Sequence, residues 1–294
     1  MHTYSHPGTL LRTLMDQSVV AAPGAFNALV AKSVAQCGFK ACYVSGGATS
    51  VAAGVPDVGI LTLDHFTKVV QEVCFGSGLP VIADADTGFG EEEMVRRTVL
   101  EYNHAGAAGL HLEDQVFPKR CGHLDGKALI PLEQAVSKVQ WAAKASQDCS
   151  DGSFIICART DAKGVEGFDA AITRAKAYVG AGATMIFPEG LTTVQEFKDF
   201  ADAMNELGDD RPYLLANMTE FGKTPMIPLK DFGDMGYSIV IYPVSTLRIA
   251  MGAIQRALAE LHSTGTLEGQ LENMQTRKEL YELVEYTPGT PWEI

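Results

Sequence analysis

Two acidic side chains, Asp84 and Asp86, stand at the end of the apolar run LPVIADAD (79–86). Side chains alternate along a strand, so both carboxylates would point to the same side. Nearby carboxylates repel each other unless a cation lies between them, and oxygen ligands suit Mg²⁺ or Mn²⁺ better than Zn²⁺. The pair therefore indicates a divalent-cation site, with a solvated acidic turn as the alternative. Glu113, at the end of the next apolar run, could hold a water molecule of that cation.

A single thiol, Cys121, lies among positive charges in the segment KRCGH (119–123). Positive neighbours lower the pKa of a thiol, because they stabilise the thiolate. A thiol that titrates near neutrality can deliver a proton to a carbanion. The segment therefore favours a catalytic Cys121 over the two alternatives, a small buried apolar side chain and a solvated basic loop.

Two further features could bind an anion. The turn SGG (45–47) follows a strand-like run, and backbone N–H groups at a glycine-rich turn can hold a carboxylate or an oxyanion. Arg159 ends another apolar run, and a buried guanidinium needs an anion, for which a substrate carboxylate offers a bidentate match. The alternative for this arginine is a structural ion pair with Asp161 or Glu189.

Three other residues receive no firm role from their spacing. Arg248 and Arg277 are either additional carboxylate-binding side chains or ordinary helix-surface cations. His111 lies in a strand-like run, where a lone histidine is more often a hydrogen-bonded core residue than a catalyst. The sequence contains no CxxC zinc motif and no Walker A motif, so neither structural zinc nor a nucleotide site is predicted.

Eight short apolar runs alternate with helix-like segments along the chain. Such runs are typical of parallel strands that are covered on both faces. Helices are predicted over 91–104, 166–180 and 245–262, and eight strand-then-helix units predict an α/β fold, a (β/α)8 TIM barrel. The alternative is an open doubly wound sheet, but no GxGxxG follows the first strand. The runs are 19–23, 41–47, 79–86, 109–114, 154–161, 184–190, 213–219 and 237–243.

Polar residues gather where these apolar runs end. In a barrel, the carboxyl ends of the strands surround one mouth, where catalytic groups lie. The number of carboxylates at the strand ends, together with an arginine, favours one shared site. The alternative is that polar residues simply follow each apolar strand where it reaches the surface. These residues are Ser45, Asp84, Asp86, Glu113, Arg159, Asp161, Glu189 and Asn217.

Composition limits the possible partners and compartment. The net charge of −13 is opposite in sign to that of proteins that bind nucleic acid or anionic membranes non-specifically. No membrane span and no secretory signal are expected from the apolar runs and the N-terminal residues. Six cysteines in a chain with a large core favour reduced thiols, and hence the cytoplasm.

Several motifs together resemble the isocitrate lyase/phosphoenolpyruvate mutase superfamily, and most closely its 2-methylisocitrate lyase branch. The resemblance covers nearly the whole chain, and KRCGH with DADTGFG is typical of the lyase side of the superfamily. The motifs are YVSGG (43–47), PDVGILTLD (56–64), DADTGFG (84–90), GLHLEDQ (109–115), KRCGH (119–123), ARTDA (158–162), FPE (187–189), NMTEFGKTP (217–225), YPVS (242–245) and MQTRKELYE (274–282).

The resemblance implies roles for particular residues. It implies Mg²⁺, with Mn²⁺ possible, at Asp84 and Asp86, supported by Asp57 and by Glu113 through water. Binding of the pyruvate or glyoxylate-like fragment would involve Tyr43, Ser45, Gly46 and Gly47. Around the rest of the substrate the resemblance implies Cys121, Gly122, His123, Arg159, Glu189, Asn217, Thr219, Arg248 and Arg277.

The resemblance also implies a reaction and an assembly. The reaction is the cleavage of 2-methylisocitrate to pyruvate and succinate, in the methylcitrate cycle of propionate catabolism. Tyr43 would act as the base and Cys121 would protonate the carbanion, while segment 117–127 closes over the site. The assembly is a homotetramer, a dimer of dimers, in which the barrel of residues 1–262 exchanges a helical extension, residues 263–294, with a neighbour. The alternatives are an alkylmalate or 2,3-dimethylmalate lyase, an oxaloacetate hydrolase or decarboxylase, and a non-catalytic carboxylate-binding protein.

Overall fold

The computed structural model describes residues 5–120 and 126–292. Eight parallel strands pair in the order β1-β8-β7-β6-β5-β4-β3-β2, and a single bridge between Gly24 and Tyr43 joins β1 to β2. This arrangement confirms the predicted barrel and excludes the open sheet. The strands are β1 (Val20–Pro23), β2 (Cys42–Val44), β3 (Val81–Asp84), β4 (Gly109–Glu113), β5 (Ile155–Thr160), β6 (Met185–Pro188), β7 (Tyr213–Asn217) and β8 (Ile239–Tyr242).

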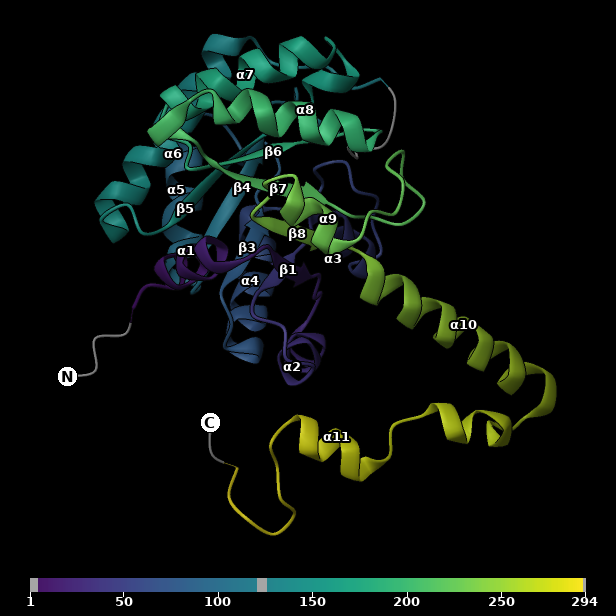
Figure 1. Cartoon of the computed structure of the whole chain (residues 1–294). Coiled ribbons are helices and arrows are strands. Elements are labelled where there is room, and N and C mark those ends of the chain that lie inside the picture. Colours follow the sequence, from purple (N-terminus) through teal and green to yellow (C-terminus); the bar gives the residue numbers. More distant parts are fainter. Residues whose placement is uncertain (1–4, 121–125, 293–294) are drawn as a thin grey trace.

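Helices surround the strands on the outside of the barrel (Figure 1). The three helices predicted from the sequence are present with small changes in their bounds, as α5, α7 and α10. The α-helices are α1 (Pro7–Gln17), α2 (Ala28–Gln36), α3 (Gly46–Ala52), α4 (Leu63–Ser77), α5 (Glu92–His104), α6 (Leu132–Ser150), α7 (Phe168–Gly180), α8 (Val194–Asn205), α9 (Leu229–Asp234), α10 (Ser245–Thr264) and α11 (Arg277–Leu283). Three short 3-10 helices are η1 (Ala162–Gly164), η2 (Gly208–Asp210) and η3 (Glu268–Asn273).

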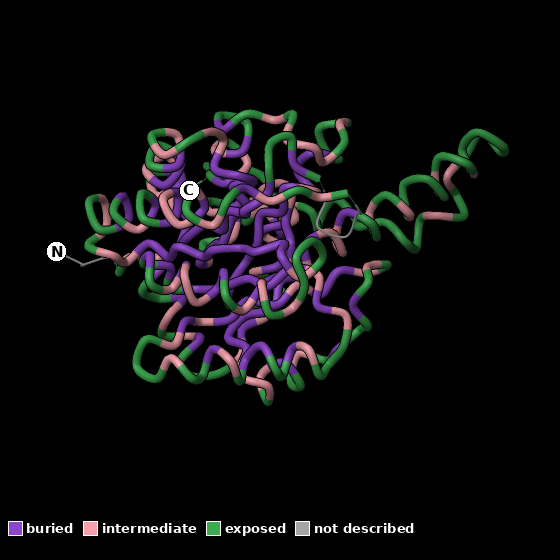
Figure 2. Tube along the Cα trace, turned by 90° about the horizontal axis from the view of Figure 1, so that it is seen from above, coloured by how far each residue is buried: buried purple, intermediate pink, exposed green. Residues whose placement is uncertain are grey.

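The interior of the barrel is a packed core and not a channel. Inward-facing residues of the strands, such as Ile82 and Leu215, form one cluster with Leu11 and Met15 of α1. Helix α1 therefore closes the amino-terminal end of the barrel, and the opposite end is left for the site. Seen from above, the buried residues form the centre of the body and the exposed residues its rim (Figure 2).

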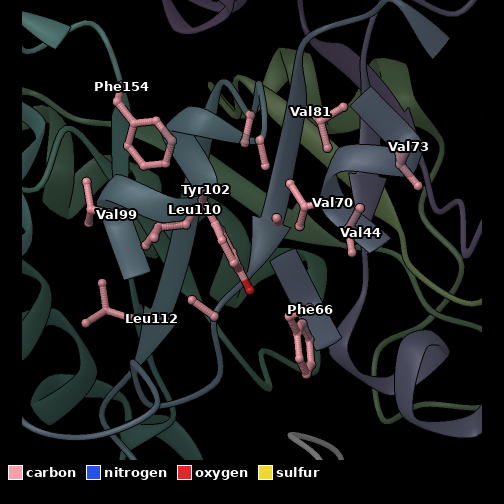
Figure 3. Close-up of a cluster of buried hydrophobic side chains, with 14 of the residues drawn as sticks. Val44, Phe66, Val70, Val73, Val81, Val99, Tyr102, Leu110, Leu112 and Phe154 are labelled. Carbon is pink, nitrogen blue, oxygen red and sulfur yellow. The ribbon is translucent and has the colours of Figure 1, made fainter. Parts of the chain in front are cut away.

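A second apolar layer fills the space between strands and helices. On the side of β2 to β5 it includes Phe66, Val99 and Tyr102, all fully buried (Figure 3). Tyr102 is the only one of these three with a polar atom, and its hydroxyl donates to the backbone carbonyl of Asp84 over 2.8 Å. The outer layer thus holds the end of β3, where the acidic pair begins.

Helix α10 leaves the body of the protein instead of covering the barrel (Figure 1). Along its length only Leu247 is buried. The exposed Met251, Ile254, Leu258 and Leu261 continue from it at spacings of four and three residues, so they form one apolar stripe. We call residues 245–292 the C-terminal arm; its α11 returns to the body and contacts α2.

Among the described residues, no helix combines the length and apolar character that a bilayer crossing requires.

Candidate active site

A cavity of about 320 Å³ opens at the carboxyl ends of the strands. It contains ten of the residues that the sequence singled out, contributed by segments far apart in the chain. The structure therefore brings most of the predicted site together at one mouth. These ten residues are Tyr43, Ser45, Gly47, Asp57, Asp84, Arg159, Glu189, Asn217, Thr219 and Arg248.

The acidic pair is held in place by backbone donors. The Asp84 carboxylate accepts from the N–H of Asp86 over 2.9 Å and from the N–H of Gly46 over 3.1 Å. A Cβ on Gly46 would lie 2.6 Å from Asp84 Oδ2 and 3.2 Å from Asp86 Oδ1, so only glycine fits beside the pair. The Gly46 N–H, predicted as a donor for an anion, thus binds Asp84 here. Ser45 caps α3 by accepting from the N–H of Ala48.

Buried carboxylate oxygens without hydrogen-bond partners surround this pair. Both Glu113 oxygens and Asp86 Oδ1 have no such partner. Burial raises the pKa of Glu113 well above its ordinary value, and burial together with Asp84 raises the pKa of Asp86 to about 6. A nearby positive charge would reduce the free-energy cost of keeping both carboxylates ionised in a buried position. The cluster is thus rich in negative charge, which ion pairs with Lys119 and Arg159 partly balance.

The residues present fit a hard divalent cation. All the candidate ligands offer oxygen, and Mg²⁺ is commonly held by one or two carboxylates with water in the remaining positions. No group of three His, Cys, Asp or Glu side chains arranged to hold a metal is found within residues 5–120 and 126–292. The Lys119 ammonium lies 2.7 Å from Asp86 Oδ1 and 2.5 Å from Asp57 Oδ1, so a cation already sits among these oxygens.

Arg159 lies at the centre of a second charged group. Its Nε is 2.9 Å from Asp161 Oδ2 and 3.3 Å from Glu113 Oε2, and its Nη1 is 3.6 Å from Glu189 Oε2. The guanidinium also packs over the Phe187 ring at 5.2 Å. The structural ion pairs that the sequence left open are therefore present, and the same side chain still lines the cavity.

Tyr43 is paired with a histidine to which sequence reasoning gave no role in the site. The Tyr43 hydroxyl lies 2.7 Å from His111 Nε2, and both residues are buried. Burial lowers the pKa of His111 to about 4, so its imidazole is neutral at pH 7 and Nε2 can accept from the hydroxyl. The sequence could have placed His111 near the site, because it stands two residues before Glu113 and therefore on the same side of β4. In the structure its partner in β3 is Asp84.

The predicted residues Cys121, Gly122 and His123 lie outside the described part of the chain. The lysines on either side of them are described; Lys119 is buried and Lys127 is half-buried. Lys119 pairs with Asp57 and Asp86, and Lys127 Nζ lies 2.7 Å from Asp161 Oδ1. The chain therefore enters and leaves this segment through ion pairs at the mouth of the barrel.

The remaining predicted residues divide into two groups. Asn217 donates to Glu189 over 3.3 Å, and Arg248 contacts Thr219 over 3.4 Å at the rim of the cavity. Arg277 lies in α11 of the C-terminal arm, beside a different cavity. Within a single chain, the structure does not bring Arg277 to the mouth.

A (β/α)8 barrel with clustered carboxylates and a buried arginine at the carboxyl ends of its strands has the arrangement of a barrel enzyme, because the active sites of such enzymes lie at this end. The chain belongs to the phosphoenolpyruvate phosphomutase family, whose model matches residues 11–262. This confirms the resemblance to the superfamily that also contains isocitrate lyase.

Curated relatives match nearly the whole chain. A protein of Corynebacterium glutamicum named "Probable 2-methylisocitrate lyase 1" is 49% identical over 264 residues, which are 90% of this chain and 84% of that protein. The 2-methylisocitrate lyase of Aeropyrum pernix is 46% identical over 281 residues, 95% of this chain and 88% of that protein.

Solved structures share the fold along the same length. Oxaloacetate acetylhydrolase with 3,3-difluorooxalacetate has a TM-score of 0.88 at 31% identity and covers 95% of this chain and 93% of its own. 2,3-Dimethylmalate lyase has a TM-score of 0.86 at 33% identity, with coverages of 95% and 92%. Phosphonopyruvate hydrolase with oxalate and Mg²⁺ has a TM-score of 0.83 at 28% identity, with coverages of 95% and 95%.

Proposed function

We propose that this protein is a Mg²⁺-dependent carbon–carbon lyase that cleaves 2-methylisocitrate to pyruvate and succinate. One observation carries the proposal: Asp84 of the acidic pair, Asp57 and the buried Arg159 line one cavity, so a single ligand can meet the carboxylates and the guanidinium. Relatives at 46% and 49% identity bear the name of this lyase, which supports the choice of substrate. The reaction belongs to the methylcitrate cycle of propionate catabolism.

The proposed cation is held by Asp84 and Asp86, with Asp57 and Glu113 beside it. Mg²⁺, or Mn²⁺, would supply Lewis acidity to the hydroxyl and carbonyl oxygens of the substrate. The burial of Glu113 and Asp86, which raises the pKa of both carboxyl groups, supports this assignment. So does the oxalate and Mg²⁺ named for the related phosphonopyruvate hydrolase.

Tyr43 is the proposed base for the substrate hydroxyl. Burial raises the pKa of Tyr43 well above its ordinary value, so a free phenolate is not favoured at neutral pH. The Tyr43 hydroxyl can therefore take the proton of the substrate hydroxyl only if it donates its own proton to an acceptor at the same time. His111 Nε2, at 2.7 Å, is that acceptor in our proposal.

The succinate half develops negative charge when the carbon–carbon bond breaks. Arg159, with Glu189 and His123, would bind and orient that half, because a buried guanidinium stabilises a carboxylate strongly. Ser45, Gly46, Gly47 and Gly122 would hold the pyruvate half, and Asn217, Thr219, Arg248 and Arg277 the outer carboxylates. Cys121 would then protonate the carbanion, in a site shielded from bulk water.

A substrate panel tests the function. Pyruvate release should be fastest from 2-methylisocitrate and roughly 10–200-fold slower in kcat/KM from isocitrate, since one methyl group in an apolar pocket discriminates by about that much. The panel also contains 2,3-dimethylmalate and oxaloacetate, scored for pyruvate, succinate, oxalate and CO₂. Preference for either would identify the protein as one of the alternative enzymes. Binding of Mg²⁺ and pyruvate with no turnover of any acid would indicate a non-catalytic carboxylate-binding protein.

We also propose that the C-terminal arm is exchanged between subunits of a homotetramer. The uncovered stripe on α10 supports this, because apolar side chains in a row gain free energy when a second copy buries them. The division into a barrel (1–262) and an extension (263–294), and the location in the cytoplasm, remain predictions from the sequence.

The stripe gives a test of this assembly. A Leu258→Glu variant should run as a smaller species than the wild type in light scattering coupled to gel filtration, because the charge would be buried in the interface. Arg256→Glu, on the opposite side of α10, is the matched control and should leave the mass unchanged. A Leu258→Glu protein with the wild-type mass would contradict the exchange.

A further inference from the structure

The ammonium of Lys119 is enclosed by carboxylates of three different chain segments. It pairs with Asp57, which follows α3, and with Asp86, which follows β3, while Glu113 ends β4 just before it in the chain. The lysine residue is only 3% exposed. A buried lysine is costly unless opposite charges surround it, and here they do.

The surrounding charges keep this lysine in its charged form. Burial alone would lower the pKa of Lys119, but Glu113, Asp84, Asp86 and Asp57 outweigh burial and raise it. In return, the ammonium supplies positive charge to Asp86 and Asp57. This is the same need for a cation that a metal ion would satisfy at the site.

The ammonium and a metal ion would compete for one oxygen. Asp86 Oδ1 is the atom that Lys119 contacts, and it is also the Asp86 oxygen that faces Gly46 beside Asp84 Oδ2. Mg²⁺ approaches its oxygen ligands to about 2.0–2.1 Å and keeps water in its other positions. The ammonium lies 2.7 Å from that oxygen, so an ion that used Asp86 Oδ1 as a ligand would have to compete with it.

We propose that Lys119 is a tethered substitute for the divalent cation: its ammonium holds the acidic cluster when no ion is bound, and leaves Asp86 when the ion binds. The inference rests on the metal site proposed above. It makes Lys119 a positioning residue, which prevents the carboxylates from repelling one another and sets the affinity of the site for Mg²⁺. Ion binding then changes the surroundings of Lys119 as well as those of Asp86.

Amine labelling of the wild-type protein tests the displacement directly. Brief trace acetylation, quantified for each lysine by mass spectrometry, should label Lys119 weakly without metal and several-fold more strongly once Mg²⁺ saturates the protein. Lys127 is the internal control, because its side chain is also largely covered, at 6% exposure, but pairs with Asp161, outside the acidic pair. A ratio of Lys119 to Lys127 labelling that stays constant at saturation would overturn the proposal.

Calorimetry of two variants separates two explanations for a change in Mg²⁺ affinity. Either the Lys119 ammonium occupies the position of the ion, or any nearby positive charge weakens ion binding by repulsion. Lys119→Gln should bind Mg²⁺ on the order of tenfold more tightly than the wild type, because the ion no longer has to displace a buried charge. Lys127→Gln removes the same charge from the same mouth and should change the affinity by less than about twofold. Equal tightening in both variants, or none in Lys119→Gln, would refute displacement.

The outcomes also separate this inference from the metal site on which it rests. If wild-type protein binds no Mg²⁺ in the calorimeter, both proposals fail together. If it binds Mg²⁺ while Lys119 stays protected, the metal site survives and only the displacement is wrong. Circular dichroism checks that Lys119→Gln is folded. If this variant is unfolded, the labelling of the wild-type protein alone decides whether Mg²⁺ displaces the Lys119 ammonium.

Discussion

An Asp86→Ala variant should lose nearly all response of its activity to added Mg²⁺. Asp86 is buried beside Asp84, and its Oδ1 is paired with the Lys119 ammonium, so the variant removes one of the two carboxylates proposed to hold the cation. Loss of one positioned electrostatic group in an active site commonly costs about 10²–10³-fold in kcat. Steady-state rates measured against Mg²⁺ concentration give both the activation by Mg²⁺ and kcat.

Glu220→Gln is the matched control for this variant. Glu220 also lines the cavity but pairs with Arg248, so its loss should leave the Mg²⁺ dependence unchanged. Because burial and Asp84 raise the pKa of Asp86 to about 6, the wild-type affinity for Mg²⁺ should fall as the pH drops through this value. A Mg²⁺ dependence that survives in Asp86→Ala would remove Asp86 from the metal site.

A Cys121→Ala variant should lose most of kcat and keep its Mg²⁺-dependent binding of pyruvate. If the thiol delivers the proton to the carbanion, its loss removes general acid catalysis, a contribution of about 10²–10⁴-fold. The acidic pair and the 45–47 turn remain intact in this variant. Single-turnover rates and calorimetric titration with pyruvate separate the two effects.

Cys37→Ala provides the comparison for this second variant. Cys37 is an exposed thiol at the end of α2 and does not line the cavity. Its replacement should change neither kcat nor pyruvate binding. Full turnover by Cys121→Ala would end the proton-donor hypothesis, whatever the other variants show.

The residues at the carboxyl ends of the strands could be predicted to share one site, because their position depends on where each apolar run ends in the sequence. Parallel strands bring their carboxyl ends to one edge of a barrel, so Asp84 and Asp86 could be assigned to the mouth. The alternation of strand side chains does not extend to Asp86, because β3 ends at Asp84 and Asp86 lies in the turn beyond it with a φ of 46°. Arg159 and Glu113 could be assigned to the same mouth by this reasoning. The structure makes them partners on neighbouring strands β5 and β4.

Pairings across the barrel were not predictable, because they depend on register and on loop paths. The contact between Tyr43 and His111 joins residues 68 positions apart. Lys119 and Asp57 are 62 positions apart and meet only because two loops converge. The sequence marked Lys119 as a positive neighbour of Cys121, whereas the structure turns its charge toward the carboxylates. Arg277 lies in α11 of the C-terminal arm, and its role in substrate binding stays a prediction.

Tyr102 connects two parts of the protein that engineers usually treat as independent. Its ring is packed in the outer apolar layer, and its hydroxyl holds the backbone of Asp84. A library aimed at heat resistance would regard the layer around Tyr102 as open to repacking, yet a sideways shift of this ring would move the first carboxylate of the acidic pair. Selection for thermal tolerance in that layer should therefore be screened for turnover at every round.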